Sequence, residues 1–475
     1  MKKIVVDNSL FQTRIALVNN CEPVEFFYES RKEKSLVGNI YAGRVENILN
    51  GMQACFVDIG FEKNGYLPIN PTSSGGILKN GDTVIVQVEK DAFGSKGVVL
   101  TQKISFAGKF LVLISEDNGS VGISRKITED SERDRIYSIA KRLLPDNCSI
   151  IVRTEGEGRS EEEFVSELDL LSQRAAYVNE KAGYRKAPAL IFEEEDFVIK
   201  VLKNIFTSDI DEVIVNSAED FDRICRANSL DTGKVTLYDE KIPVFESFYI
   251  ESKIDKLFCN KIWLKSGGFI IIEQTEACVV IDVNTGKYTG KKNIQETFLK
   301  TNLEAADEIA SQIRLRNLSG MIIIDFIDMK DEKSRQQLTK RLQAAVKNDR
   351  MKTTVVGMTE LGLMQLTRKK SSLPVISLIS GECMACKGRG ITPSCEYTSG
   401  KILREIISVF SSTMFSKITV CSNKKVLGFL KNDGLPYIEE IERNFKRRVV
   451  LKEIETAALD YYELKKEMSG NEGAL

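Results

Sequence analysis

The feature that most constrains the fold is a glycine-rich segment between Gly38 and about Lys103. Glycine recurs there at nearly every turn, in GNIYAGRV, NGMQ, DIGF, NGYL, NGDT and FGSKG, with short runs of alternating apolar and polar residues between the turns. Short strands joined by tight turns are typical of a small closed or nearly closed barrel. We therefore expect one β-barrel domain of roughly 65 residues.

The other segments predict further domains, because 475 residues exceed what one hydrophobic core usually holds. The first thirty residues predict an antiparallel meander of three strands, and Ser160 begins a helix with a capping box, SEEE. Residues 262 to 345 follow the order strand, strand, helix (about 295 to 317), strand, helix (about 331 to 347), which is an α/β layer. A small α/β unit runs from about 395 to the C-terminus.

Composition excludes several classes of function. Histidine is absent, which removes the usual general base and every Ser-His or Cys-His nucleophile. The 67 basic and 68 acidic residues nearly cancel, so a nucleic-acid partner must be held by local patches. No stretch approaches the ~18 apolar residues of a membrane helix, and MKKIVVDNSL lacks a signal-type apolar run. We expect a cytoplasmic protein with no membrane partner.

Two aromatic side chains of the barrel segment are predicted to point outward. Alternation in QACFVDIG places Phe56 on the face opposite its apolar neighbours, and the same pattern in NGYLPI places Tyr66 outside. Together with nearby cations they make a stacking platform for single-stranded nucleic acid: Arg44, Lys90 and Lys96. The alternative is that another domain covers both rings.

Carboxylates interrupt two apolar strands. Asp325 lies in MIIIDFIDM, where burial of an unpaired charge needs compensation, and Asp282 shares a strand face with Asn284 in ACVVIDVN. Two such strands at one edge of an α/β sheet are placed to share a hard divalent cation, of which magnesium is the natural choice. The alternative is that Asp325 or Asp328 caps the following helix or turn, and that Asp282 bonds the TGKYTG turn.

A third pattern is the close pair Cys383 and Cys386 in CxxCxGxG. One such pair is half of a tetrahedral zinc site. Cys395 and Cys421 of the same chain, or the same pair of a second subunit, would complete it. The rival interpretation is a redox pair, although the strand-to-helix context of a thioredoxin motif is missing.

Arg153 and Thr154 close the strand CSIIVRT, just before the EGEG loop. A cationic fork, a hydroxyl and free backbone N–H groups can converge there on one anion. The alternative is that Arg153 pairs with Glu155, Glu157 or the acids that begin the next helix.

These segments carry a family resemblance. GNIYAGRVENILNGMQACFVDIGFEKNGYLPI is similar to the OB-fold RNA-binding domain named after ribosomal protein S-one. Together with GGFIIIEQTEACVVIDVNTGKYTG, TNLEAADEIASQIRLRNLSGMIIIDFIDM and ELGLMQLTRK, it resembles the ribonuclease E/G family over nearly the whole chain. Because the chain stops just after the small domain, it resembles the shorter ribonuclease G type.

The resemblance implies an α/β and β multidomain fold. The implied parts are an RNase H-like part (1–33 and 197–257), an OB-fold RNA-binding domain (34–103), a 5′-sensor domain (104–196), a DNase I-like catalytic domain (258–379), a zinc link (380–393) and a small C-terminal domain (394–475).

The resemblance also implies roles for single residues. The family's magnesium-binding carboxylates match Asp282 and Asp325, and its supporting amide matches Asn284. The RNA-contacting positions match Phe56, Tyr66 and Lys96. The 5′-monophosphate sensor matches Arg153 and Thr154, supported by Gly108 and Val112. Cys383 and Cys386 would bind a zinc shared by two subunits. Two positions depart from the family: Gln274 stands in place of a His, and Lys352 in place of an Arg. Lysine lacks the bidentate fork of arginine.

The implied function is a magnesium-dependent endoribonuclease that cuts single-stranded RNA, namely mRNA and rRNA precursors. A magnesium-activated water would attack the phosphate and leave a 5′-phosphate and a 3′-hydroxyl. The alternative is a non-catalytic RNA-binding scaffold, against which the intact Asp282, Asn284 and Asp325 count.

Overall fold

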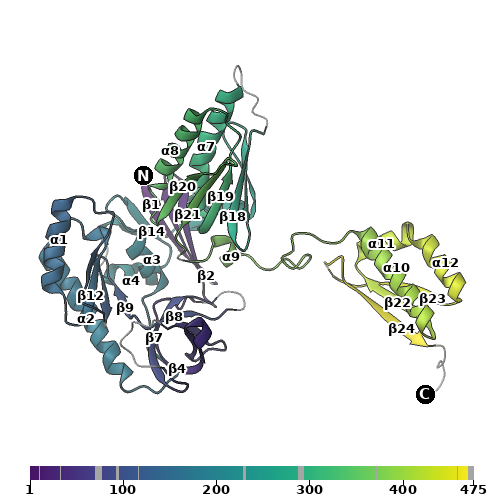
Figure 1. The fold of residues 1–475 in the computed structure, drawn as a ribbon, viewed down its shortest axis with the longest axis horizontal. Coiled ribbons are helices and arrows are strands. Elements are labelled where there is room, and N and C mark those ends of the chain that lie inside the picture. The colour runs from purple at the N-terminus through teal and green to yellow at the C-terminus, as the bar shows by residue number, and fades with distance from the viewer. Residues whose placement is uncertain are drawn as a thin grey trace. The chain divides into compact units, whose positions relative to one another are not determined.

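The computed structural model describes residues 1–9, 11–32, 34–69, 78–92, 96–115, 117–227, 232–286, 294–370, 372–456 and 458–468. The chain forms two compact units, Met1–Ile379 and Ser380–Leu475 (Figure 1). None of the helices in the described ranges is both long and apolar enough to cross a membrane.

The predicted N-terminal meander is confirmed. Its strands pair in the order β1-β2-β3, and β14 adds to β1 in parallel, so the first thirty residues share a sheet with a segment two hundred residues later. Apolar side chains of β1 alternate between two cores, which explains its nearly continuous burial. The sheet and its helices are β1 (Lys2–Asn8), β2 (Gln12–Asn19), β3 (Glu22–Ser30), α3 (Phe197–Ile205), β14 (Glu212–Val215), α4 (Ala218–Arg226), η3 (Thr232–Lys234), β15 (Val235–Leu237), α5 (Val244–Ser247), α6 (Glu251–Asp255) and η4 (Lys256–Phe258).

The predicted barrel is also confirmed. Its strands follow the order β4-β5-β6-β8-β7, and a further pairing of β4 with β7 closes it. Glycine is needed in the wall: a Cβ at Gly43 would lie 2.4 Å from Val57 Cγ1, and one at Gly65 would lie 2.4 Å from Leu100 Cδ1. The elements are β4 (Ile40–Leu49), η1 (Asn50–Met52), β5 (Ala54–Asp58), β6 (Gly65–Pro68), β7 (Thr83–Lys90) and β8 (Val99–Thr101), with β13 (Ala189–Phe192) paired to β4.

The segment after the barrel forms a sheet in the order β11-β12-β10-β9, packed against two helices. The capping box at Ser160 is present, with the Ser160 side chain bound to the Glu163 N–H and the Glu163 side chain bound to the Ser160 N–H. The elements are β9 (Ser105–Ala107), β10 (Leu111–Ser115), β11 (Val121–Ile123), α1 (Asp130–Leu143), β12 (Cys148–Val152), η2 (Thr154–Gly156) and α2 (Glu161–Ala182).

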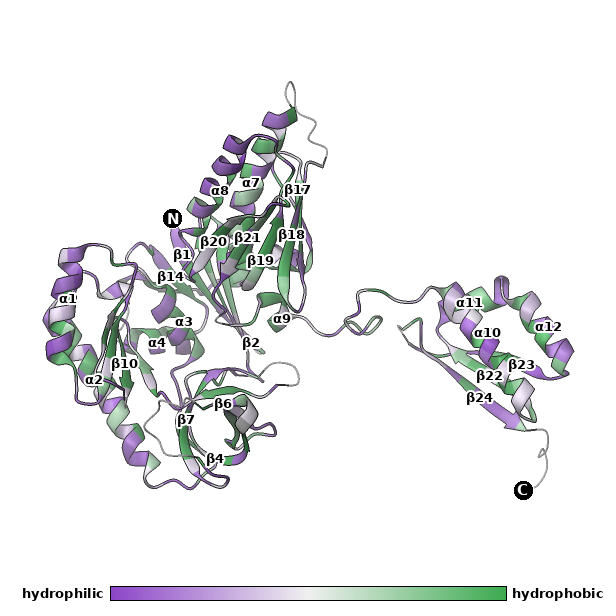
Figure 2. Cartoon of the chain, in the orientation of Figure 1, coloured by the Kyte–Doolittle hydropathy of each residue, from purple (hydrophilic) through white to green (hydrophobic). Residues whose placement is uncertain are grey.

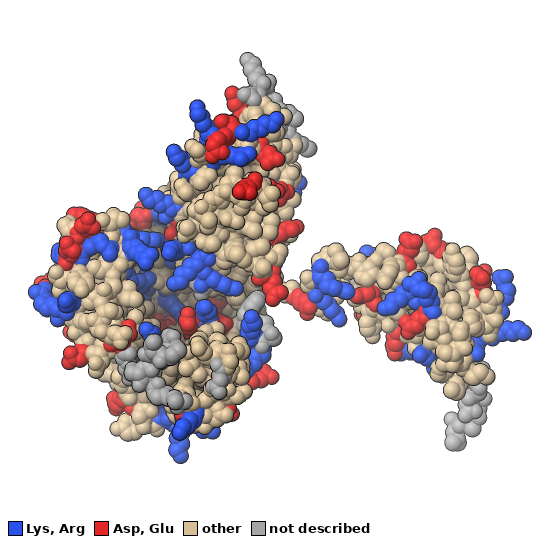
Figure 3. All heavy atoms as spheres, viewed as in Figure 1, with Lys and Arg blue, Asp and Glu red and all other residues tan. Residues whose placement is uncertain are grey.

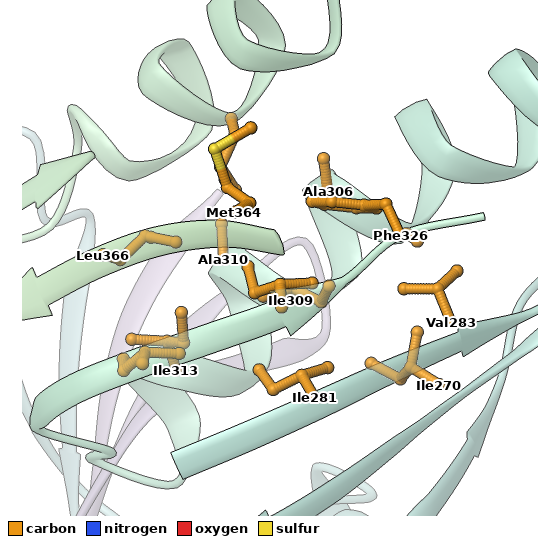
Figure 4. Packing of buried hydrophobic residues seen from close by; sticks show 14 of the residues in the cluster. Ile270, Ile281, Val283, Ala306, Ile309, Ala310, Ile313, Phe326, Met364 and Leu366 are labelled. Carbon is orange, nitrogen blue, oxygen red and sulfur yellow. The ribbon is translucent and has the colours of Figure 1, made fainter. Parts of the chain in front are cut away.

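The predicted α/β layer has the strand order β16-β17-β18-β19-β21-β20. Figure 4 shows Ile281 of β18 near Ile309 of α7, and Val283 near Phe326, within one buried core. Figure 2 shows apolar residues concentrated in β18, β19 and β21, with hydrophilic residues along α8. The elements are β16 (Lys261–Trp263), β17 (Phe269–Gln274), β18 (Cys278–Asn284), α7 (Ile294–Leu315), β19 (Gly320–Asp325), α8 (Glu332–Val346), β20 (Thr353–Met358), β21 (Leu363–Arg368) and α9 (Val375–Ile379).

The second unit is a small α/β fold in which three helices pack on a sheet of order β23-β22-β24. The elements are α10 (Cys395–Ser412), β22 (Phe415–Ser422), α11 (Lys424–Asn432), α12 (Leu435–Phe445), β23 (Arg448–Glu453) and β24 (Tyr462–Met468).

Candidate functional site

The structure brings the two predicted carboxylates side by side. Strands β18 and β19 are parallel, and their register pairs Asp282 directly with Asp325. Asp325 is the last residue of β19, and Asn284, two residues after Asp282, is the last of β18. Directly paired residues of neighbouring strands send their side chains to one face of the sheet. The two carboxylates therefore share one face at the C-terminal ends of their strands.

That face is the one opposite the helices. In β18 the buried residues alternate with the half-buried Asp282 and Asn284, so the apolar side chains take the core face and the polar ones the other. Asn284 Nδ2 donates a hydrogen bond of 2.6 Å to Asp282 Oδ2. The amide thereby fixes one carboxylate oxygen, and among the described residues no donor binds the other oxygen, which can accept a ligand.

Like charges gather at this end of the sheet. Partial burial raises the pKa of Asp325, and the negative charges of Asp282 and Asp328 raise it further. In the described part of the chain, no Lys or Arg nitrogen lies within 4.0 Å of these three carboxylates. Among the described residues, therefore, no cation neutralises these carboxylates.

Two expectations about these aspartates are corrected. Asp325 is exposed rather than buried, because β19 ends at this residue and the chain leaves the sheet there. Neither Asp325 nor Asp328 caps α8, because Asp331 is its N-cap and accepts the Ser334 N–H at 3.1 Å. Residues 287–290 of the TGKYTG turn lie outside the described residues, so the alternative partner of Asp282 is not described.

The donor set fits a hard cation with an incomplete protein shell. Within the described ranges no three or more Cys, Asp or Glu side chains gather as a metal site. Two carboxylates with no ion pair in the described chain can still hold magnesium, which usually keeps several water ligands and takes only one or two carboxylates from the protein.

On the barrel, Phe56 and Tyr66 are paired across β5 and β6, with ring centroids 6.3 Å apart in an edge-to-face arrangement. Both side chains are half-buried, whereas their neighbours Cys55 and Leu67 are fully buried inside. The predicted outward direction of both rings is confirmed. Lys96 is exposed, and Arg44 instead donates to the Ala187 carbonyl at 2.8 Å.

Arg153 is held without an ion pair. Its Nη1 donates to the Gly108 carbonyl at 2.7 Å, and its Nη2 donates to Asn204 Oδ1 at 2.6 Å. No carboxylate among the described residues lies within 4.0 Å of it, so the alternative that Arg153 pairs with neighbouring acids is wrong. A guanidinium held by neutral acceptors keeps its charge for an external anion.

Charges of both signs surround Arg153. Burial lowers its pKa; the charges of Glu167 and Glu155 raise it in part, and that of Arg350 lowers it. Arg350 Nη1 donates to the Asn204 carbonyl at 3.2 Å, so one asparagine joins the two arginines. Figure 3 shows Lys and Arg side chains gathered in a hollow of the first unit.

The other predicted sensor positions lie on the segments next to Arg153 in the sequence or in the sheet. The Thr154 hydroxyl lies 2.9 Å from that of Ser124. Val112 is half-buried in β10, opposite Ile151. A Cβ at Gly108 would lie 2.6 Å from Glu167 Cδ, so this position excludes any side chain.

The sequence did not predict the roles of Glu167, Asn204 and Arg350. The Glu167 carboxylate accepts the backbone N–H groups of Phe110 and Leu111 at 2.8 Å each, and so fixes the loop after Gly108. Arg350, rather than Lys352, is the cation from this segment whose charge reaches Arg153. No local spacing signals these residues, because they come from α2, from α3 and from the segment between α8 and β20.

The four cysteines considered for zinc do not form one site in a single chain. Cys383 is exposed and Cys386 half-buried, whereas Cys395 begins α10 and Cys421 is buried in β22. They form no group of three or more ligands, although the structure describes all four. Backbone N–H groups of Cys386 and Ala385, and the Cys386 side chain, lower the pKa of the Cys383 thiol, which favours the thiolate.

Comparison with known proteins places this chain among ribonucleases. A profile described as the Ribonuclease E/G family matches residues 105–371, and one described as the RNase E/G thioredoxin-like domain matches residues 382–467. The chain is 34% identical to ribonuclease G of Haemophilus influenzae over 466 residues, which are 93% of this chain and 94% of that protein. It is 32% identical to ribonuclease G of Escherichia coli K12 over 462 residues, again 93% and 94% of the two chains. Ribonuclease E of Haemophilus influenzae is 31% identical over 473 residues, 95% of this chain and 50% of that protein.

Proposed function

The chain belongs to the ribonuclease E/G family and is an endoribonuclease, and on that premise we propose that it cleaves single-stranded RNA at the site formed by Asp282, Asn284 and Asp325. The observation that carries the proposal is the direct pairing of two carboxylates that have no cation within ion-pair distance in the described chain. Like charges held together at no gain in stability are a mark of a functional site.

Asp282 and Asp325 would hold magnesium there, and Asn284 orients Asp282 through the hydrogen bond of 2.6 Å. The bound cation would supply positive charge and lower the pKa of water, which suits hydrolysis to a 5′-phosphate and a 3′-hydroxyl. The chain has no histidine, so the route through the 2′-hydroxyl lacks its usual acid and base.

The barrel is the proposed RNA-holding part. Phe56 and Tyr66 present half-buried rings on its outside, and stacking on such rings tolerates any base sequence. Lys96 is exposed and supplies a phosphate contact.

Arg153 and Thr154 are the proposed sensor of an RNA 5′-monophosphate. Among the described residues, the Arg153 guanidinium binds two neutral acceptors and has no carboxylate within 4.0 Å. The Thr154 hydroxyl adds a second donor for a phosphate oxygen. Gly108 and Val112 shape the loop and strand around them. Stimulation of cleavage by a 5′-monophosphate follows.

Cys383 and Cys386 are proposed to supply two of the four ligands of a zinc ion. The same pair of a second chain would supply the other two. The support is the exposed, thiolate-favouring Cys383 and the separation of Cys395 and Cys421 from it. Zinc content of one ion per two chains, and weaker self-association after both cysteines are changed to serine, test this arrangement. One zinc per chain contradicts it.

The proposed cellular role is processing and decay of mRNA and rRNA precursors. The alternative, a non-catalytic RNA-binding scaffold, retains the barrel but gives no reason to keep two unpaired carboxylates beside one another. The two readings differ in whether the chain cuts RNA in magnesium.

The test compares Asp282→Asn and Asp325→Asn with the parent on a short unstructured RNA. Each change keeps the size of the side chain but removes the charge that holds a hard cation, so we expect cleavage to fall at least about 100-fold, with RNA binding retained. Glu273→Gln is the matched control, since Glu273 is an exposed carboxylate on the same strand face as Ile271 and Phe269. Equal cleavage by all four proteins moves the catalytic centre elsewhere.

A further inference from the structure

Three side chains on the first strands of the catalytic sheet form a cluster that the proposed chemistry does not use. Lys261 and Trp263 lie two residues apart on β16, and Phe269 is the direct partner of Trp263 on β17. The two rings meet edge to face with centroids 5.4 Å apart. Lys261 Nζ lies 4.3 Å from the Trp263 ring centroid and 3.7 Å from that of Phe269, so the ammonium contacts both rings. We name these three residues the aromatic cluster.

The strand register puts the aromatic cluster on the face that carries the carboxylates. Phe269 is the direct partner of Asn284, so Trp263, Phe269 and Asn284 form one cross-strand row. Ile271 pairs with Lys261 on one side and with Asp282 on the other, and Asp282 pairs with Asp325. The next row is therefore Lys261, Ile271, Asp282 and Asp325. Because paired residues share a face, the side chains of the aromatic cluster and the carboxylates point to the same side of the sheet.

The separation suits neighbouring nucleotides. Strand β16 lies two strand spacings from β18, which is about 10 Å, and the two rows are about 7 Å apart along the strands. A chain with its phosphodiester at the carboxylates therefore has a flanking base within reach of the cluster. Strands β16, β17 and β18 are neighbours in one sheet, so the aromatic cluster and the carboxylates lie on one continuous surface.

A purely structural role does not explain the solvent exposure of the aromatic cluster. Trp263 is 58% exposed, although tryptophan is the side chain that gains most from burial, and its neighbours Ile262 and Leu264 are half-buried and buried. A lysine alone is enough to protect an edge strand from pairing. An exposed ring and an ammonium side by side offer the two contacts that single-stranded nucleic acid uses, a stacking face and a positive charge.

We propose that Trp263, Phe269 and Lys261 form a stacking subsite for an RNA base that flanks the cleaved phosphodiester. The inference rests on the proposed function and adds to it a second contact region, on the catalytic sheet itself rather than on the barrel. It commits to single-stranded RNA as the occupant, because the face continues directly into the carboxylate row and carries the charge that complements a phosphate.

The first test uses the intrinsic fluorescence of Trp263, the chain's only tryptophan. The full-length Asp282→Asn variant, which is expected to bind RNA without cutting it, is titrated with a short unstructured RNA. Stacking predicts saturable quenching of the emission at the RNA concentrations that saturate binding measured separately. Inorganic polyphosphate is the control, since it offers charge without bases and should leave the emission unchanged.

The second test is kinetic. Trp263→Ala should lower kcat/KM on the same RNA by about 5- to 100-fold, the range that loss of one base–aromatic contact gives. Trp263→Phe should restore most of the loss, because it keeps a ring. Tyr437→Ala, which removes a 61% exposed ring of the second unit, is the matched control and should cut at the parent rate.

The outcomes separate the subsite from the function. If the parent cuts RNA, the emission does not respond to RNA and Trp263→Ala cuts at the parent rate, the subsite is wrong and the proposed function stands. If the emission is quenched by RNA but the parent does not cut, the subsite stands and the catalytic proposal fails. A lower solution mass of Trp263→Ala with unchanged kcat/KM makes the cluster a contact between copies of the chain and overturns the proposal.

Discussion

The sheet that carries Asp282 and Asp325 has a buried ion pair at one end and two neighbouring carboxylates at the other. At one end Arg368 of β21 binds Asp349 through hydrogen bonds of 2.7 and 3.2 Å, and both side chains are only 3% exposed. Thr353 and the Met351 N–H complete the carboxylate's partners. At the other end Asp282 and Asp325 lie together with no cation within 4.0 Å in the described chain. A buried pair depends on both partners, because either charge alone would be costly to keep out of water, whereas an unpaired pair of like charges stays available for a ligand.

The largest expected effect is at the paired end. Arg368→Ala leaves Asp349 buried without its partner, and we expect a loss of about 3 to 5 kcal/mol in the free energy of unfolding, measured by urea denaturation. The matched control is Arg341→Ala. Its pair with Asp307 has side chains 54% and 45% exposed, so the cost should stay below about 1 kcal/mol. Equal losses in the two variants would remove the distinction between the buried pair and an exposed one.

The second prediction concerns Arg153, a cation that has no ion pair among the described residues. Arg153→Ala should lower kcat/KM on 5′-monophosphorylated RNA by about 10- to 100-fold, because a charge-assisted hydrogen bond contributes roughly 1.5 to 3 kcal/mol. RNA with a 5′-hydroxyl has no phosphate for this pocket and should be cut at the parent rate. The same loss on both RNAs would make Arg153 a structural residue that holds Gly108 and Asn204 together.

The smallest expected effects are on how stability depends on pH, where Asp349 and Asp325 act in opposite directions. Burial alone would raise the pKa of Asp349, but hydrogen bonds from Arg368 and its charge lower it below the ordinary value. Its contribution to stability is therefore present above about pH 4 and is lost as the pH falls further. The pKa of Asp325 is raised, so the folded chain binds this proton more readily than the unfolded chain, and stability falls as the pH rises through the interval above about 4.

Asp325→Asn should thus raise the free energy of unfolding at neutral pH in the absence of divalent cations, by less than about 1 kcal/mol because the group is exposed, and should have no such effect below pH 4. Thermal unfolding of parent and variant between pH 3 and 7 measures the difference. A gain that does not depend on pH would mean that repulsion at Asp325 is not its cause.

Local sequence was enough to predict several of the elements and the two apolar strands that carry Asp282 and Asp325. The capping box at Ser160, the meander and the apolar strands with Asp282 and Asp325 each follow from periodicity within ten to twenty residues. The burial of Asp325 was predicted wrongly, because an apolar run does not reveal the residue at which a strand leaves the sheet. The sequence pattern likewise did not show where α8 begins, and its N-cap is Asp331, three residues after Asp328.

Contacts between distant segments could not be predicted. Asn204 meets Arg153 across 51 residues, and Arg350 meets Glu25 across 325. The row from Trp263 to Asn284 depends on the register of two antiparallel pairs, which no single strand pattern fixes. Tertiary packing therefore decides which charges are paired and which are left open.

The most direct test of that difference is the response of the folded chain to magnesium, without RNA and without activity as the readout. Magnesium should raise the unfolding temperature of the parent relative to EDTA, because a ligand that binds only the folded state stabilises it by RT ln(1 + [Mg²⁺]/Kd). The Asp282→Asn, Asp325→Asn double variant should unfold at a higher temperature than the parent in EDTA and show no rise with magnesium. An equal rise in both proteins would contradict the claim that the unpaired carboxylates of β18 and β19 are the cation site.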